Sequence, residues 1–294
     1  MVWRLAAGAW IAALVIPSLA LAGSPPDSSA TPAAPANQRW SSFLPLEADL
    51  ATSRGIQLPL PFGVGVVYYH LARDIKITDV RVGRNGAPPT SVSDFATLAA
   101  NSNVENVNLK LDAWILPFVN VYAIVGLVFN DSQTRIDVTL PPIVPSNPPR
   151  RFVMDVPTKI QGDVEGLGTT IAGGYPPYFL VVDVNAAAAN LGFDNRLKAT
   201  IVSSRGGWTG LIRRRDTQLW LGATYWDTFA TPTGTVPDPD GGTLTFQVDQ
   251  GPKWPWTYSV GSHVAFTQRI EMAVDLGADM HGGWTLALIP GYRF

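Results

Sequence analysis

The sequence contains no cysteine and little charge. The absence of cysteine from all 294 residues excludes a disulfide scaffold and a zinc or iron–sulfur site with cysteine ligands. Only 15% of the residues are charged and 46% are hydrophobic, whereas a typical soluble domain carries about 25% charged residues. The formal net charge of −2 argues against a nucleic-acid-binding protein with a broad basic surface. The high apolar content also excludes an acidic disordered tail protein.

Long hydrophobic runs are confined to the N-terminus. Residues 1–22 are typical of a secretory signal peptide, because Arg4 precedes an apolar stretch and Ala20-Leu21-Ala22 fits a cleavage site. The stretch is short for a transmembrane anchor. Residues 23–40 are rich in Pro, Ser and Ala, which predicts a disordered leader. After residue 22 no run of about 18 apolar residues occurs, so a helical membrane protein is not expected.

Residues 63–294 instead alternate between polar and apolar residues with a period of two. The segment 106–115 is the clearest, with Asn106, Asn108, Lys110, Asp112 and Trp114 on one face and apolar residues on the other. Ten such segments have about the length that a tilted membrane strand needs. They are residues 63–71, 106–115, 119–129, 167–175, 178–188, 196–204, 217–225, 256–266, 270–276 and 284–294.

This alternation predicts an all-β fold, an antiparallel up-and-down transmembrane β-barrel of about ten strands. Such a barrel places lipid-facing residues at every second position, which reconciles the mean hydropathy of +0.12 with the missing membrane helix. The count falls to eight if the weak segments 63–71 and 167–175 are not strands. It rises to twelve if residues 75–82 or 151–164 add a hairpin.

The connections between these segments differ in length. The long ones, residues 72–105, 131–166 and 232–255, all fall on one side when the connections alternate. Long outer loops and short periplasmic turns are typical of outer-membrane barrels, so both termini are expected in the periplasm. Residues 41–62 precede the first strand, and we expect a periplasmic cap, a plug segment or an ordinary linker there.

The C-terminal segment 284–294 resembles the last strand of Gram-negative outer-membrane β-barrel proteins. Its terminal Phe294, with Tyr292 two residues earlier, matches their pattern, although Pro290 removes a ladder donor. The resemblance implies recognition of Tyr292 and Phe294 by the barrel assembly machinery and a location in the bacterial outer membrane. Residues 60–70, 106–126 and 170–175 also resemble a poorly characterised porin-like group, which implies architecture but no specific activity.

The face opposite the apolar rows carries the residues that would line the lumen. Charges of both signs are expected there, because charges in a low-dielectric wall pair or face water. In the segment 196–204, Leu197, Ala199 and Ile201 are predicted to face lipid. Small inward residues such as Gly126 and Gly261 are expected to leave room for water or a ligand. The lumen-lining candidates are Lys110, Asp112, Trp114, Tyr122, Asp183, Lys198, Trp220, Glu271, Asp275 and Arg293.

These features favour a narrow passive channel or transport-associated barrel for small solutes. The alternative is a structural or interaction barrel with a closed lumen, which binds lipopolysaccharide or other partners through its outer loops. An outer-membrane hydrolase is disfavoured, since Ser262 and His263 are adjacent and face opposite sides of a strand, and His281 beside Asp279 is an isolated loop histidine. We predict no catalytic residue, no metal site, no cofactor and no nucleic-acid partner.

Overall fold

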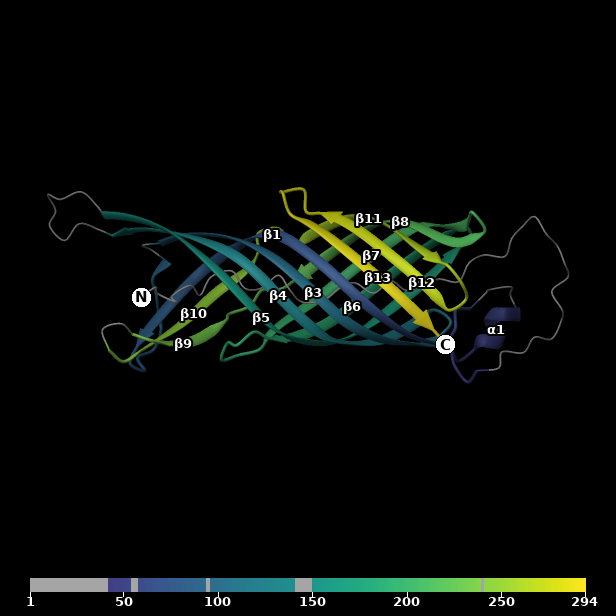
Figure 1. Cartoon of the computed structure of the whole chain (residues 1–294), viewed down its shortest axis with the longest axis horizontal. Coiled ribbons are helices and arrows are strands. Elements are labelled where there is room, and N and C mark those ends of the chain that lie inside the picture. The colour runs from purple at the N-terminus through teal and green to yellow at the C-terminus, as the bar shows by residue number, and fades with distance from the viewer. Residues whose placement is uncertain (1–41, 54–57, 94–95, 141–149, 239–240) are drawn as a thin grey trace.

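The computed structural model describes residues 42–53, 58–93, 96–140, 150–238 and 241–294. The predicted signal peptide and the predicted leader, residues 1–40, lie outside them. Ten antiparallel strands close into a barrel, because the last strand pairs with the first (Figure 1). They are β1 (Phe62–Arg84), β3 (Ala96–Leu116), β4 (Val119–Leu140), β5 (Arg150–Tyr175), β6 (Tyr178–Asn190), β7 (Leu197–Ile212), β8 (Arg215–Asp227), β11 (Trp256–Ala265), β12 (Ile270–Ala278) and β13 (Trp284–Arg293).

Each of the ten predicted segments coincides with one barrel strand, and three of them run one residue past a strand end, so the predicted fold class and strand number are confirmed. The extra hairpins considered at residues 75–82 and 151–164 are wrong, because both segments continue β1 and β5. Three shorter strands lie outside the barrel ring: β2 (Thr90–Ser91), β9 (Thr233–Pro237) and β10 (Thr243–Pro252). β10 pairs with the far half of β1, and β9 pairs with β10.

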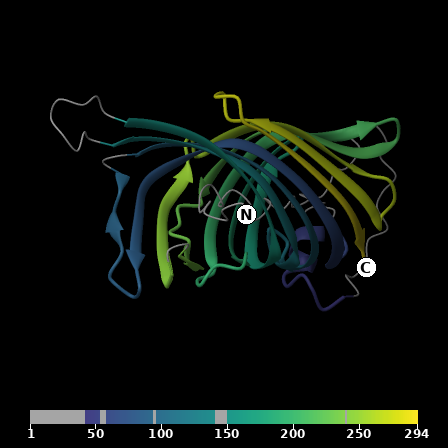
Figure 2. The same ribbon diagram turned by 60° about the vertical axis from the view of Figure 1, so that its left-hand side comes forward.

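The two ends of the barrel differ, as predicted. At the turn end, which also carries Phe62 and Phe294, strands are joined by connections such as Pro117–Phe118, Pro176–Pro177 and Arg213–Arg214. Both arginines have positive φ angles, 52° and 64°, which is the geometry of the two-residue turns that join β-hairpins. At the opposite, loop end, β1, β3, β4 and β5 run far beyond the other strands (Figures 1 and 2). Much of the predicted long loops is therefore strand.

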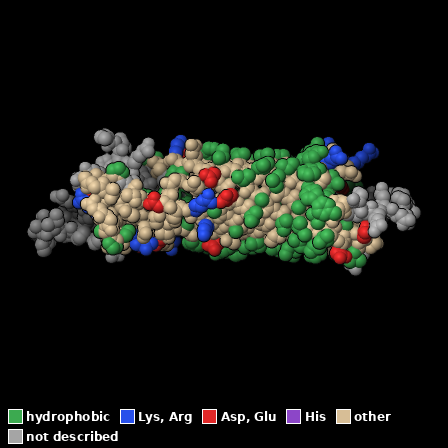
Figure 3. All heavy atoms as spheres, turned by 90° about the horizontal axis from the view of Figure 1, so that it is seen from below, with side chains coloured by type: hydrophobic (Ala, Val, Ile, Leu, Met, Phe, Trp, Pro, Cys, Tyr) green, Lys and Arg blue, Asp and Glu red, His purple; other side chains and the backbone are tan. Residues whose placement is uncertain are grey.

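The outer surface carries an apolar band around the half of the barrel nearer the turn end (Figure 3). Its side chains alternate with buried ones along each strand, so they face outward rather than into a core. Above the band the outward residues on β3, β4 and β5 become polar, including Asn103, Asp131 and Lys159. A band of this kind is what the hydrocarbon layer of a membrane requires. Exposed members include Val107, Leu109, Leu111, Val121, Val125, Leu127, Phe129, Leu167, Leu180, Val182, Leu219, Leu221, Val260 and Leu276.

The predicted orientation of one strand is wrong. On β7 the side chains of Leu197, Ala199 and Ile201 are buried, with at most 4% exposed, whereas Lys198 is exposed on the outer face. The register with β6 and β8 fixes this choice, since Ile201 lies opposite Trp226, which is itself buried. The alternation of polar and apolar residues shows only that the two faces of a strand differ. Along this part of β7 the inner face of the barrel is apolar, so the polar residues face outward. Lys198 does not line the lumen.

A short helix, α1 (Ala48–Ser53), lies at the turn end. The Leu46 amide donates a hydrogen bond to the Ile115 carbonyl, and the rings of Phe43 and Phe62 lie 5.9 Å apart. Ala48 and Ala51 are buried. These contacts attach residues 43–51 to the end of the barrel, and the role of residues 41–62 as a cap or plug stays a prediction. No helix in the described part of the chain is both long and apolar enough to cross a membrane.

Candidate functional site on the inner face of the barrel

A layer of charged side chains crosses the inner face near the turn end. Arg293 on β13 donates to Asp112 on β3 over 3.0 Å and lies 3.5 Å from Glu271 on β12. Lys110 lies 3.9 Å from the Asp112 carboxylate. His263 on β11 lies 3.8 Å from Glu271. Cations and anions therefore alternate from Lys110 through Asp112 and Arg293 to Glu271, which compensates the cost of placing charge on an inner wall.

A second group surrounds Asp183 on β6. The Tyr122 hydroxyl donates to its carboxylate over 3.0 Å, and Thr170 donates over 2.5 Å. The ammonium of Lys110 lies 4.9 Å from the centre of the Tyr122 ring, which is a cation–π distance. This group is continuous with the charged layer through Lys110, and Asp183 has no exposed surface.

The third group lies on β8, β11 and β12. The Trp220 indole N–H donates to Asp275 over 2.8 Å, and Ser259 donates to the same carboxylate over 3.1 Å. The guanidinium of Arg205 lies 6.0 Å from the Trp220 ring. Asp183 and Asp275 thus each accept a hydrogen bond from an aromatic side chain, which fixes the direction in which the Tyr122 and Trp220 rings lie.

Glycines on neighbouring strands let these rings lie flat against the wall. A Cβ atom at Gly168 would lie 2.2 Å from the Tyr122 ring, and one at Gly261 would lie 2.3 Å from the Trp220 ring. Any larger residue would push the rings toward the barrel axis. The space that Gly261 was expected to leave for water or a ligand is therefore taken by Trp220. Even so, the glycine keeps this ring from projecting into the lumen.

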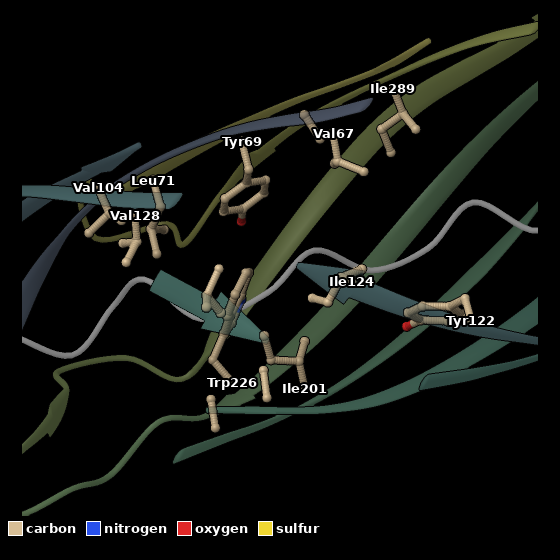
Figure 4. Close-up of a cluster of buried hydrophobic side chains, with 14 of the residues drawn as sticks. Val67, Tyr69, Leu71, Val104, Tyr122, Ile124, Val128, Ile201, Trp226 and Ile289 are labelled. Atoms are coloured by element: carbon tan, nitrogen blue, oxygen red, sulfur yellow. The ribbon is translucent and has the colours of Figure 1, made fainter. Parts of the chain in front are cut away.

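Above these polar groups the inner face becomes apolar (Figure 4). The rings of Tyr69 and Trp226 lie 5.7 Å apart, and the Trp226 indole N–H donates to Thr257 over 3.1 Å. A cavity of about 10 Å³, the size of one water molecule, lies between Tyr69, Trp226, Arg205 and Asp275. The other buried members of this region include Val67, Leu71, Val104, Ile124, Val128, Leu197 and Ile201.

The structure thus brings nine of the ten predicted lumen-lining residues to the inner face, Lys198 being the exception. Trp114 is 1% exposed, at the turn end. Sequence reasoning missed Arg205 and Arg73, because the predicted segments 196–204 and 63–71 end before them. The number of arginines in the sequence gives no sign that either one faces inward. Arg205 could have been inferred only by reading β7 in the orientation that puts it on the same face as Asp183 and Trp220.

The remaining candidates have structural partners. Asp279 accepts backbone hydrogen bonds from His281 and Gly283, both 2.8 Å, and the His281 ring packs on Trp254 at 4.6 Å. Asp249 pairs with Arg81 over 2.6 Å. Ser262 and His263 differ in direction, since only His263 is buried. Within the described ranges no group of three His, Asp or Glu side chains is arranged to hold a metal ion.

Tyr292 and Phe294 face outward at the turn end. The Phe294 ring stacks on Phe62 of β1 at 5.9 Å and lies 6.4 Å from Tyr292. The Phe294 amide and carbonyl exchange hydrogen bonds with Phe62, at 3.0 and 3.1 Å. The last residue therefore closes the seam between the first and last strands.

Comparison with known proteins shows similarity in fold only. No protein-family model and no curated protein match the chain. Among solved structures, the outer membrane protein OprG from Pseudomonas aeruginosa has 8% identity and a TM-score of 0.42, covering 81% of this chain and 98% of OprG. An outer membrane channel from Pseudomonas putida F1 has 13% identity and a TM-score of 0.35, over 81% and 97%. The Ralstonia pickettii toluene transporter TbuX has 10% identity and a TM-score of 0.33, over 81% and 90%.

Proposed function

We propose that this protein is an outer-membrane barrel that passes small solutes through its lumen by passive diffusion. The observation that carries the proposal is the inner wall itself. It holds paired charges of both signs near the turn end, and two of its large aromatic rings, Tyr122 and Trp220, lie close over Gly168 and Gly261. Hydrogen bonds hold the Tyr122 and Trp220 side chains in this position, which supports a path along the barrel axis.

The outer surface supports the membrane part of this proposal. The apolar band ends in polar residues at the loop end and in aromatic residues such as Phe118, Tyr175 and Phe266 at the turn end. Aromatic girdles at the interface are typical of outer-membrane barrels. We place the turn end in the periplasm and the long strands of β1 to β5 outside the cell. Lipid and lipopolysaccharide would then surround the band, and the barrel assembly machinery would recognise Tyr292 and Phe294.

Solute selection would come from the charged layer. Lys110, Asp112, Glu271 and Arg293 lie in one network, so a permeating ion passes charges of both signs. Removing one charge leaves an excess of the other sign, which attracts the opposite ion. We propose no catalytic role for these groups, because each has an ion-pair partner on the wall.

Planar bilayers containing the refolded protein test the proposal. We expect steady ion conductance, with Lys110→Met shifting the selectivity toward cations and Asp112→Asn or Glu271→Gln shifting it toward anions. Lys198→Met is the matched control, since it removes a lysine charge from the outer face and its selectivity should stay near that of the unchanged protein. A folded barrel without conductance would instead favour the closed structural barrel.

A further inference from the structure

A row of hydrogen-bonding side chains crosses the inner face of the strands that extend beyond the apolar band. Arg73 on β1 lies opposite Ser102 on β3, Ser102 opposite Ser132 on β4, and Ser132 opposite Thr158 on β5. Thr134 follows Ser132 by two residues and so faces the same side. The row therefore gathers one guanidinium and four hydroxyls from four neighbouring strands.

Three of these hydroxyls are buried without a partner. The hydroxyl oxygens of Ser132, Thr134 and Thr158 are shielded and make no hydrogen bond, and the Ser132 and Thr134 side chains are 0% and 1% exposed. Ser102 differs, since it donates to Asn130 over 2.8 Å. A buried hydroxyl left without a partner costs about 1–3 kcal/mol. Three on one wall indicate that something in the lumen supplies their hydrogen bonds.

An aromatic surface lies at one end of the row. The Arg73 guanidinium sits 5.1 Å above the ring of Trp226, and Trp226 lies 5.7 Å from Tyr69. A flat apolar ring beside several hydroxyls and a fixed guanidinium matches a molecule with both hydroxyls and an apolar C–H face. A neutral sugar has that chemistry.

The row lies on the inner face toward the loop end of the barrel, which the proposed function places outside the cell. The residues that alternate with it on β3, β4 and β5 face outward and are polar, including Asn103 and the pair Asp131 and Lys159, joined over 3.1 Å. The row therefore stands above the apolar band, where a solute from outside would arrive first.

We infer that Ser132, Thr134 and Thr158, with Arg73 and Trp226, form an entry site for a neutral polyhydroxylated solute of monosaccharide size. The inference rests on the proposed function, because an entry site needs a path behind it. It goes beyond that function by naming the solute class and by separating its selection from the charged layer at the other end.

The test compares D-glucose entry with ion conductance in the same reconstituted protein. The triple variant Ser132→Ala, Thr134→Val and Thr158→Val keeps side-chain volume nearly constant and removes only the hydroxyls. We expect glucose-driven swelling of vesicles to slow about fivefold, in line with the loss of several hydrogen bonds, while KCl conductance changes less than about twofold. Thr200→Val is the matched control, because Thr200 on β7 is exposed on the outer face.

Heat-modifiable gel migration confirms that the triple variant is folded before its transport is measured. Glucose entry that is unchanged in a folded triple variant would overturn the inference and assign the hydroxyls to bound water, with the proposed channel intact. An equal slowing in the Thr200→Val control would overturn it as well. A protein that passes neither KCl nor glucose would overturn both the entry site and the channel.

Discussion

Arg293 and Asp112 form an ion pair across the seam of the barrel, with β1 between them. Gly63 on β1 lies opposite both residues in the two ladders, and the 3.0 Å contact passes over it. A Cβ atom at Gly63 would lie 2.3 Å from the Asp112 carboxylate and 3.1 Å from the Arg293 guanidinium. The missing side chain on the first strand is what lets the second and last strands of the barrel ring be joined by charge.

Gly63→Ala should therefore weaken closure of the barrel. The new methyl group displaces the Asp112 carboxylate, and overpacking of this kind costs about 1–3 kcal/mol. Urea unfolding in lipid vesicles measures the loss. Gly173→Ala is the control, because no atom lies within 4 Å of the Cβ it would add. Equal stability of the two variants would contradict the account.

Tyr122→Phe removes the hydroxyl that donates to Asp183 over 3.0 Å. Removing one partner of a buried polar group costs about 1–3 kcal/mol, so we expect a loss of that size in the unfolding free energy. Tyr175→Phe serves as the comparison, since Tyr175 is 85% exposed and its variant should match the unchanged protein. A Tyr122→Phe barrel of full stability would show that Thr170 and Asn185 satisfy Asp183 without the Tyr122 hydroxyl.

The β1–β2 contact should loosen in acid. Hydrogen bonds from Ser91 and Ser93 hold the pKa of Asp79 below its ordinary value of 3.8. A lowered pKa in the folded state stabilises the contact above about pH 4 and loses this contribution as the pH falls through the lowered pKa. Amide protection of Val80 and Val92 reports the change, because their N–H groups donate to Ser93 and Val80.

The double variant Ser91→Ala and Ser93→Ala should abolish this acid sensitivity by removing both donors. Val92 is the amide to follow in this variant, because the Val80 amide loses its acceptor together with Ser93. Protection that falls in acid to the same extent with and without the two serines would assign the effect to another group.

Cysteine labelling tests the orientation of β7. The chain has no cysteine, so a single introduced thiol gives an unambiguous signal. Lys198→Cys should react with a bulky maleimide at least about tenfold faster than Ile201→Cys, because thiol reactivity requires exposure and Ile201 is 0% exposed. The reverse order would restore the inward Lys198 that the sequence predicts.

Loss of the terminal aromatic ring should impair assembly. Phe294→Ala removes the stacking on Phe62 and the proposed recognition element, so we expect the heat-modifiable fraction in outer membranes to fall severalfold. Phe266→Ala is the matched control, because Phe266 is an exposed aromatic residue near the same end of the barrel. If both variants assemble equally, Phe294 is an ordinary girdle residue.

Much of the architecture is predictable from the sequence alone. The alternation in segments such as 106–115 favours a sheet with two unlike faces, and an apolar row at every second position favours closure of that sheet into a membrane barrel. The ten strands and the side on which the long connections lie follow from these two facts. The lengths of β1 and β5 do not, because the pattern of residues 75–82 and 151–164 fits a separate hairpin as well as a continued strand.

The sequence by itself determined that this chain is a barrel with paired charges on one face, since a period of two is a local property of the backbone. Only the tertiary structure decided which face of β7 is inside, because the inner wall is polar near the turn end and apolar above it. It also decided that Arg205 and Arg73 face inward and that Ser132 and Thr158 are neighbours. Those relations arise from register between strands far apart in the chain, and each strand's own pattern is compatible with either side.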